Sequence, residues 1–181
     1  MKTIKINNSN LNKLKISNVK ISKDEHTHGG SYVGDRKDDK MDGNGTYFYK
    51  DGSIYVGEWK NNKMDGEGTF DWSDGEKYVG QWKNDEKNGY GIYTWADGEV
   101  YVGNWENDKK NGEGIYTWSD GEIYVGGWKD DKRQGEGIHT RADGEKYIGQ
   151  WVDDIREGKA INICSNGEFQ VGSFKDNEFV G

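Results

Sequence analysis

The stretch YVGQWKNDEKNGYGIYTWADGEV, residues 78–100, decides the fold, because close variants of it follow one another along most of the chain. Equivalent positions lie 23 residues apart. The tyrosine that opens each unit recurs six times, at Tyr32, Tyr55, Tyr78, Tyr101, Tyr124 and Tyr147. A fixed period of roughly 20–50 residues is the signature of a repeat protein, in which each unit is completed by packing on its neighbours.

Glycine and tryptophan follow the same period. The chain has 181 residues with 28 Gly and no Pro, and only 31% of its residues are hydrophobic while 32% are charged. Such a composition alone is typical of a disordered chain. Four rows of the repeat nevertheless hold 26 of the 28 glycines, and two rows hold all eight tryptophans. The positions of these residues therefore predict an ordered repeat array instead of a disordered chain. No run approaches the roughly 18 apolar residues of a membrane span, and a lone cysteine excludes a disulfide scaffold.

Each unit is predicted to form two strands. The first is of the type Tyr55–Trp59 and the second of the type Gly66–Trp72, with a polar loop over 60–65 and a tight turn over 73–75. Turn signals at this spacing predict an all-β fold, an elongated, twisted, single-layer antiparallel β-meander. The absence of Pro agrees, because Pro would remove a hydrogen-bond donor from any central strand.

The alternation of side chains selects the turn. A three-residue turn over 73–75, ending on a glycine with positive φ, pairs Phe70 with Tyr78 and Gly68 with Gly80. Every aromatic and glycine row then lies on one face of the sheet, and we expect the indoles to lie over the neighbouring glycines. The other face pairs β-branched residues amid charges.

These residues resemble the MORN repeat family, whose unit runs Tyr-x-Gly-x-Trp, a polar loop, Gly-x-Gly and Asp-Gly. Tyr78-Val79-Gly80-Gln81-Trp82, Gly89-Tyr90-Gly91 and Asp97-Gly98 match that order. The resemblance covers residues 29–181 as six full repeats and a partial seventh, and it implies an elongated sheet with a groove. We expect residues 1–28 to form a basic Lys/Asn-rich tail or edge cap, and 29–181 to form the MORN repeat array.

The end units depart from the pattern, as expected for the terminal repeats of an array. The atypical residues at aromatic, tryptophan or glycine positions are Arg36, His139, Arg141, Ala160, Asn162, Cys164 and Gln170.

The aromatic-glycine face is the predicted functional surface, because a single-layer sheet leaves it without a covering layer and large apolar patches usually mark interfaces. The resemblance implies a non-catalytic scaffold or adaptor. Its expected partner is a helical or extended protein segment, or a second MORN protein, in the cytoplasm and with a cytoskeletal or ciliary assembly as one setting. The predicted partner-binding residues are Tyr55, Trp59, Trp72, Tyr78, Trp82, Trp95, Tyr101, Trp105, Trp118, Tyr124 and Trp128.

The distribution of charge along the chain bears on whether the partner is a protein, a nucleic acid or a membrane. Residues 1–23 carry six Lys and no acidic residue, so the net charge of −8 leaves −14 on residues 24–181. An array this acidic should repel nucleic acid and anionic lipid. A phospholipid-associated module tethered through the basic segment is the alternative reading, with a membrane partner disfavoured by the array.

No catalytic, cofactor or metal site is predicted, and we expect no enzyme. His26 and His28 form only a weak metal pair, His139 replaces an aromatic residue, and Cys164 replaces a tryptophan. The acidic residues around the Asp-Gly turns are explained by turn geometry better than by calcium, which needs about six or more oxygen ligands around one ion.

Overall fold

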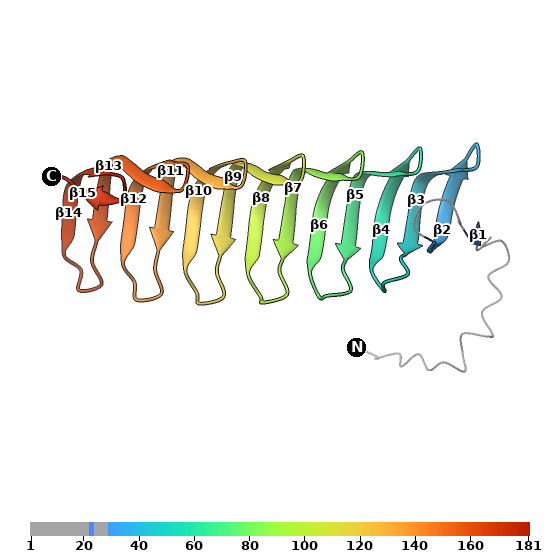
Figure 1. The fold of residues 1–181 in the computed structure, drawn as a ribbon, viewed down its shortest axis with the longest axis horizontal. Helices are drawn as coiled ribbons and strands as arrows, with labels where there is room; N and C mark the ends of the chain where they lie inside the picture. The colour runs from blue at the N-terminus through green and yellow to red at the C-terminus, as the bar shows by residue number, and fades with distance from the viewer. Residues whose placement is uncertain (1–21, 24–28) are drawn as a thin grey trace, which may run out of the picture.

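The chain forms one continuous antiparallel sheet. The computed structural model describes residues 22–23 and 29–181, and within them fifteen strands pair strictly in chain order. Figure 1 shows the strands side by side along one long axis. This confirms the predicted all-β, single-layer meander. The strands are β1 (Ser22–Lys23), β2 (Ser31–Lys37), β3 (Lys40–Phe48), β4 (Ile54–Lys60), β5 (Lys63–Asp71), β6 (Lys77–Lys83), β7 (Glu86–Thr94), β8 (Val100–Glu106), β9 (Lys109–Thr117), β10 (Ile123–Lys129), β11 (Lys132–Thr140), β12 (Lys146–Val152), β13 (Ile155–Ile163), β14 (Phe169–Lys175) and β15 (Glu178–Phe179).

The turn between repeats has the predicted form. The Trp72 amide donates to the Glu76 carbonyl at 2.9 Å, and the Gly75 amide donates to the Trp72 carbonyl at 3.1 Å. Gly75 has φ +96°, which a residue with a side chain rarely adopts. Phe70 therefore pairs with Tyr78, as expected.

The turn within each repeat is tighter than expected. The predicted polar loop over 60–65 is wrong, because Lys60 pairs with Lys63 and only two residues connect the strands. Asn61 and Asn62 have φ of 48° and 70°, the type I′ turn that suits the twist of a hairpin. Asn and Asp tolerate this conformation better than other side chains. The same turn recurs at 38–39, 84–85, 107–108, 130–131, 153–154 and 176–177.

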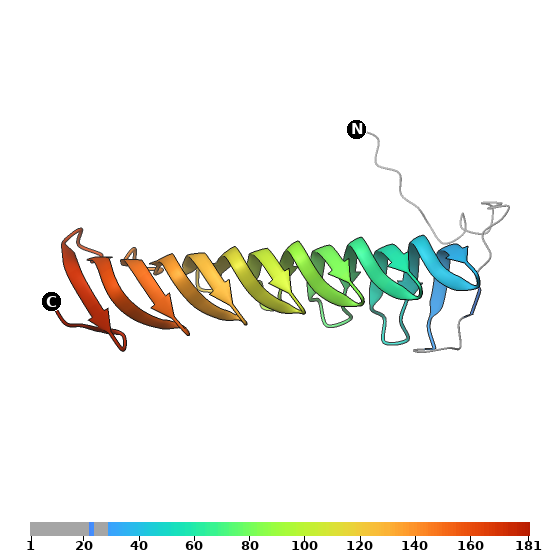
Figure 2. The same ribbon diagram turned by 90° about the horizontal axis from the view of Figure 1, so that it is seen from above.

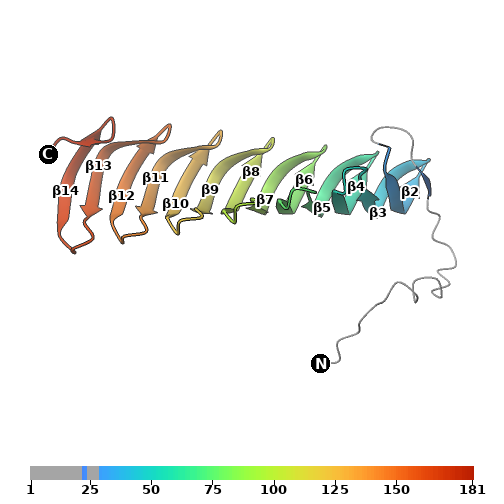
Figure 3. The ribbon, with the colours of Figure 1, turned by 60° about the horizontal axis from the view of Figure 1, so that its bottom comes forward.

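The hairpins bend where the ladder is irregular. Gly57 pairs with Gly68 but Trp59 pairs with Met64, so one residue of β4, Glu58, opposes three of β5. Gly66 lies in this bulge with φ +109°. Bulges bend a strand and increase its twist. In Figures 1 and 2 the upper ends of the strands accordingly turn over and run obliquely, and Figure 3 shows the strands as successive curved ribbons.

Each hairpin tip is fastened to the preceding repeat. The Met64 amide donates to Asp85 Oδ1 at 2.7 Å, and the Asp85 amide donates back to the Met64 carbonyl at 3.0 Å. The same two-way contact recurs 23 residues on, between Lys87 and Asp108. The tips thus form a second ladder beside the strand ladder, and this ladder holds the bent ends over the aromatic face.

The aromatic face is the core. The side chains of Tyr78 and Trp82 are 0% and 5% exposed, and their rings meet edge to face at 5.0 Å between centroids. Tyrosine rings, rather than the expected indoles, cover the glycine row: a Cβ on Gly91 would lie 2.3 Å from Tyr78 Oη. The glycines are therefore required for tyrosine burial in this single-layer sheet.

At the first edge, Ser22 pairs with Tyr32 and Lys23 with Ser31. The rest of the predicted tail or cap over 1–28 lies outside the described residues, so this boundary stays a prediction.

Candidate protein-binding surface

The eleven predicted partner-binding residues fall into two groups. Eight are buried against one another and are at most 5% exposed: Tyr55, Trp59, Tyr78, Trp82, Tyr101, Trp105, Tyr124 and Trp128. The other three, Trp72, Trp95 and Trp118, are half-buried and pack on the edge of that core. Binding by any of the eleven stays a prediction, but only these three indoles offer appreciable surface. We call Trp72, Trp95 and Trp118 the tryptophan row.

Each indole of the tryptophan row lies between rings of its own and the next repeat. Trp95 is 4.6 Å from the ring centroid of Tyr93 and 5.1 Å from that of Tyr116. Trp72 stacks on Phe70 at 4.4 Å. This packing fixes one side of every indole. Lys87 Nζ and Lys110 Nζ lie 5.8 and 5.6 Å from the ring centroids of Trp72 and Trp95, and the rings remain partly exposed.

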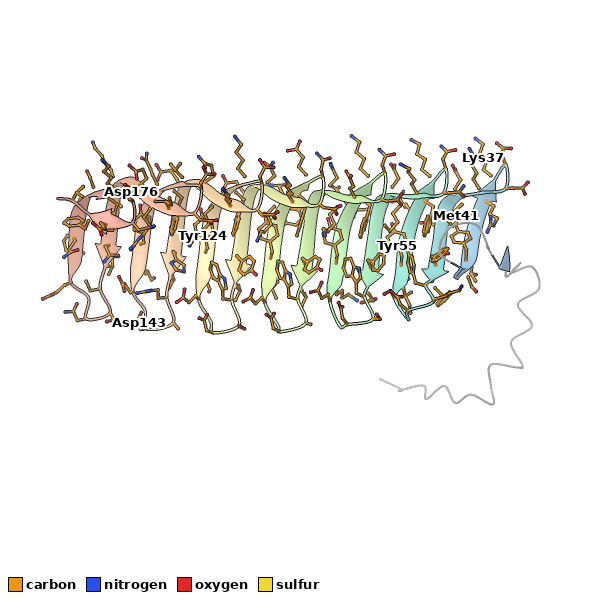
Figure 4. All side chains as sticks on the ribbon, viewed as in Figure 1. Lys37, Met41, Tyr55, Tyr124, Asp143 and Asp176 are labelled. Carbon is orange, nitrogen blue, oxygen red and sulfur yellow. The ribbon has the colours of Figure 1, made fainter. Side chains whose placement is uncertain are left out.

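The tryptophan row lies at the edge of the sheet where the Asp-Gly turns are. In Figure 4, Asp143 marks this turn edge, and Lys37 and Asp176 mark the opposite tip edge. The three central turns, Trp72–Glu76, Trp95–Glu99 and Trp118–Glu122, each carry two carboxylates and no Lys or Arg. Each half-buried indole therefore lies beside carboxylates without a cation in the same turn.

Turn geometry orients these carboxylates. Asp97 Oδ1 accepts a hydrogen bond from the Glu99 amide at 3.0 Å, and the Tyr116 hydroxyl donates to Glu99 Oε2. The same arrangement links Asp74, Glu76 and Tyr93 one repeat earlier.

Burial raises the pKa of Tyr93 and of Tyr116, and the hydrogen bond to glutamate raises it further. These hydroxyls therefore stay protonated and act as donors.

Where another residue replaces the tyrosine at the positions of Tyr93 and Tyr116, its contacts at this edge change with it. Phe70 has no hydroxyl, and the residue that would face it is Ser53 instead of glutamate; Ser53 is buried and accepts from the Ser73 amide at 3.1 Å. His139 replaces the tyrosine of the fifth repeat, and its Nε2 lies 2.8 Å from Glu122 Oε2. Burial lowers the pKa of His139, although Glu122 acts in the other direction.

A row of long side chains on the bent hairpins covers the core from the other side. Lys110 Nζ lies 4.6 Å from the ring centroids of both Tyr116 and Trp128. Burial lowers the pKa of Lys110. Arg133 lies over Trp151 at 4.0 Å. Sequence reasoning missed this row because it assigned these positions to solvated loops. The detectable signal was the 23-residue row itself, whose side chains have apolar stems that can cover rings: Met41, Met64, Lys87, Lys110, Arg133 and Arg156.

The outer face carries a stripe of β-branched side chains. Ile92 and Ile115 are 41% and 43% exposed, and cross-strand pairing makes the stripe continuous. Its exposed members are Val56, Val79, Ile92, Ile115, Val125, Ile138, Ile161 and Val171.

Residues 22–23 and 29–181 contain no group of three His, Cys, Asp or Glu placed to hold a metal ion. They also contain no helix long and apolar enough to cross a membrane. Cys164 is a free, half-buried thiol among them, while His26 and His28 lie outside the described residues.

Comparison with known proteins agrees with this architecture. The structure of the SAS-4 TCP domain of Drosophila melanogaster, in complex with a proline-rich motif of Ana2, superposes with a TM-score of 0.50. It is 13% identical in sequence, and 97% of each chain is covered, so the likeness is one of fold. No curated protein matches significantly. The MORN repeat matches six consecutive units, residues 32–54, 55–77, 78–100, 101–123, 124–146 and 147–169. The chain therefore belongs to the MORN repeat family, as its residues predicted.

Proposed function

We propose that this protein is a non-catalytic, protein-binding scaffold that holds a segment of a partner along the tryptophan row. One observation carries the proposal. Of the eleven aromatic residues predicted to bind, only Trp72, Trp95 and Trp118 keep an appreciable part of their surface outside the core, and they do so beside carboxylates. Aromatic residues anchored in a rigid surface are the side chains that most often dominate binding energy.

The scaffold is organised before any partner arrives. The indoles are fixed by ring contacts of 4.4 to 5.4 Å, and the turns beneath them by backbone hydrogen bonds. Binding to such a surface needs little ordering of the protein itself, which favours affinity. The repeat presents the same combination of indole and carboxylates three times in a line.

The fold neighbour supports a protein partner. The SAS-4 TCP domain, whose match covers 97% of this chain, was solved with a protein motif bound. That motif is a partner of the SAS-4 TCP domain and is not assigned to this chain. The likeness supports only the general role of such a sheet as a holder of protein segments.

The lipid-associated alternative has less support. The indoles lie among turn carboxylates, which would repel an anionic membrane surface. Sedimentation with anionic vesicles, with and without residues 1–23, tests it: binding that survives the deletion at physiological salt would favour lipid over the scaffold. A cytoplasmic setting in a cytoskeletal or ciliary assembly is part of our proposal, and localisation of the tagged chain tests it.

The proposal is tested by quantitative capture of partners with two matched variants. The first is Trp95→Arg with Trp118→Arg, for which Arg141 is the precedent at the same position of the fifth repeat. The second is Ile92→Thr with Ile115→Thr on the outer stripe, for which Thr69 is the precedent. Circular dichroism establishes that both variants fold.

We expect the tryptophan-row variant to lose partners that the wild type captures, and the stripe variant to keep them. Equal capture by wild type and the tryptophan-row variant would contradict the proposal. Loss of partners only in the stripe variant would move the binding surface to the outer face.

A further inference from the structure

Resting on the proposed function, we propose that the segment held by the tryptophan row is a polyproline II helix with a proline face and one arginine or lysine in each turn. Its prolines lie on the indoles and its cations face the carboxylates of the turn edge. The proposal names the conformation and chemistry of the partner, which the general scaffold role does not.

The spacing of the row selects the conformation. Two strands separate equivalent residues of neighbouring repeats, so successive indoles lie about 9.6 Å apart. A polyproline II helix has three residues per turn and rises about 3.1 Å per residue, so one turn covers about 9.3 Å. Every third residue of such a segment therefore meets an equivalent indole, with a drift of only about 0.6 Å between Trp72 and Trp118.

Other conformations fit less well. Seven residues of an α-helix span about 10.5 Å, and the drift over the same two repeats is about 1.8 Å. In an extended strand three residues span about 10 Å, but side chains alternate between faces, so every third residue points the opposite way. The polyproline II helix combines the same face at every third residue with the smallest drift along the three indoles.

The charge of the row selects the side chains. The three turns beside the indoles contribute six carboxylates, the two acidic residues of each turn, and no cation. Two cations of the bent hairpins reach the row: Lys87 Nζ lies 5.8 Å from the ring centroid of Trp72, and Lys110 Nζ lies 5.6 Å from that of Trp95. Lys87 is also 3.6 Å from Asp108, so the six turn carboxylates still outnumber the cations beside them. A partner that carries one cation per turn matches the turns one for one.

The row also has a defined end. The next position is Arg141, whose guanidinium is 3.0 Å from Glu145 Oε2 and adds a positive charge where an indole would lie. Three turns of the partner, about nine residues, therefore cover the row. Indole faces accept both proline rings and arginine side chains, which agrees with this combination.

The test uses the full chain and synthetic peptides in a calorimetric titration at low and physiological salt. The probe is (Pro-Pro-Arg)4. A second peptide of the same composition, with eight prolines followed by four arginines, removes the three-residue period, and (Pro-Pro-Glu)4 reverses the charge. We expect the periodic basic peptide to bind about tenfold more tightly than the block peptide, the equivalent of three weak exposed ion pairs, and the acidic peptide not to bind.

Two triple variants separate a local contact from general attraction. Asp74→Asn, Asp97→Asn and Asp120→Asn remove three charges from the turn edge, and Asn166 shows that asparagine keeps the turn, since its Oδ1 accepts from the Glu168 amide at 2.9 Å. Asp130→Asn, Asp153→Asn and Asp176→Asn remove three charges from the tip edge, where Asn61, Asn84 and Asn107 occupy the same position. We expect about tenfold weaker binding of (Pro-Pro-Arg)4 by the first variant and no change by the second.

Equal binding of the periodic and block peptides, or equal loss in the two triple variants, would overturn the inference. These results are distinguishable from failure of the proposed function. If Trp95→Arg with Trp118→Arg loses its protein partners while no peptide binds selectively, the scaffold role stands and only the polyproline II partner is wrong. If that variant keeps every partner, the scaffold role on this row fails whatever the peptides do.

Discussion

Trp105 and Trp118 belong to one repeat and lie on the same face of the sheet, yet their surroundings differ. Trp105 is 5% exposed, with Tyr101 and Tyr78 edge-on at 5.1 and 5.6 Å and Lys87 above its ring at 5.1 Å. Trp118 contacts Tyr116 and His139 and remains half-buried. The difference comes from the bent hairpin, which covers one end of each strand and leaves the turn end uncovered. One face thus provides both the core and the proposed binding surface.

The sharpest test of this comparison is to truncate both indoles separately. Trp105→Ala should lower the free energy of unfolding by about 3–5 kcal/mol, because it leaves a cavity among packed rings. Trp118→Ala should lower it less, by about 1–2 kcal/mol, because part of that ring is already in water. Urea unfolding followed by circular dichroism measures both. Equal losses would mean that the two indoles are equally buried.

Glycine substitutions extend the comparison to the backbone. A Cβ on Gly103 would lie 2.6 Å from both Tyr101 Oη and Gly114 Cα, so Gly103→Ala should cost about 1–3 kcal/mol of stability through overpacking. Gly98 in the turn has open space around it but φ +89°, so Gly98→Ala should cost about 1 kcal/mol through strain. Thermal unfolding of the two variants checks the order, and a harmless Gly103→Ala would contradict the close contact of ring and glycine.

The contact that holds the bent hairpins is tested at Asp131. Its Oδ1 accepts from the Lys110 amide at 2.9 Å, and its φ is 70°. Asp131→Ala should cost about 1–2 kcal/mol through the lost hydrogen bond and the backbone strain. Asp131→Asn is the control and should be nearly neutral, because Asn62 and Asn177 make the same contact. Chemical denaturation distinguishes them, and an equal loss in both variants would assign the effect to charge.

The smallest expected effect is a pH dependence at the end of the tryptophan row. Burial lowers the pKa of His139 in the folded chain below its ordinary value near 6.5, so the unfolded chain binds the proton more readily. Stability from this group is present above about pH 6.5 and is lost as the pH falls toward the folded pKa. His139→Tyr, which restores the residue type of Tyr93 and Tyr116, should lose less stability than wild type between pH 7 and 5. Identical pH profiles by thermal unfolding would contradict this assignment.

The strand order, the register and the three-residue turn were predictable because the 23-residue period and the alternation of side chains allow one pairing that keeps the rings on one face. The burial of the predicted site residues was not. It depends on the bend at Gly66, on the Asn61-Asn62 turn and on contacts between Met64 and Asp85, which lie 21 residues apart. A polar stretch read in isolation indicates a loop. Only the folded structure, in which this polar stretch lies over the core, shows that it covers the rings.

One face of the sheet holds a closed core and a partly exposed tryptophan row, and hydroxyl-radical footprinting with mass spectrometry tests this difference at every tryptophan. In the free protein, Trp72, Trp95 and Trp118 should be oxidised much faster than Trp82, Trp105 and Trp128. Adding captured partner or (Pro-Pro-Arg)4 should protect the first three and leave the others unchanged. Equal oxidation of both groups in the free protein, or protection of neither group by a bound partner, would contradict the account.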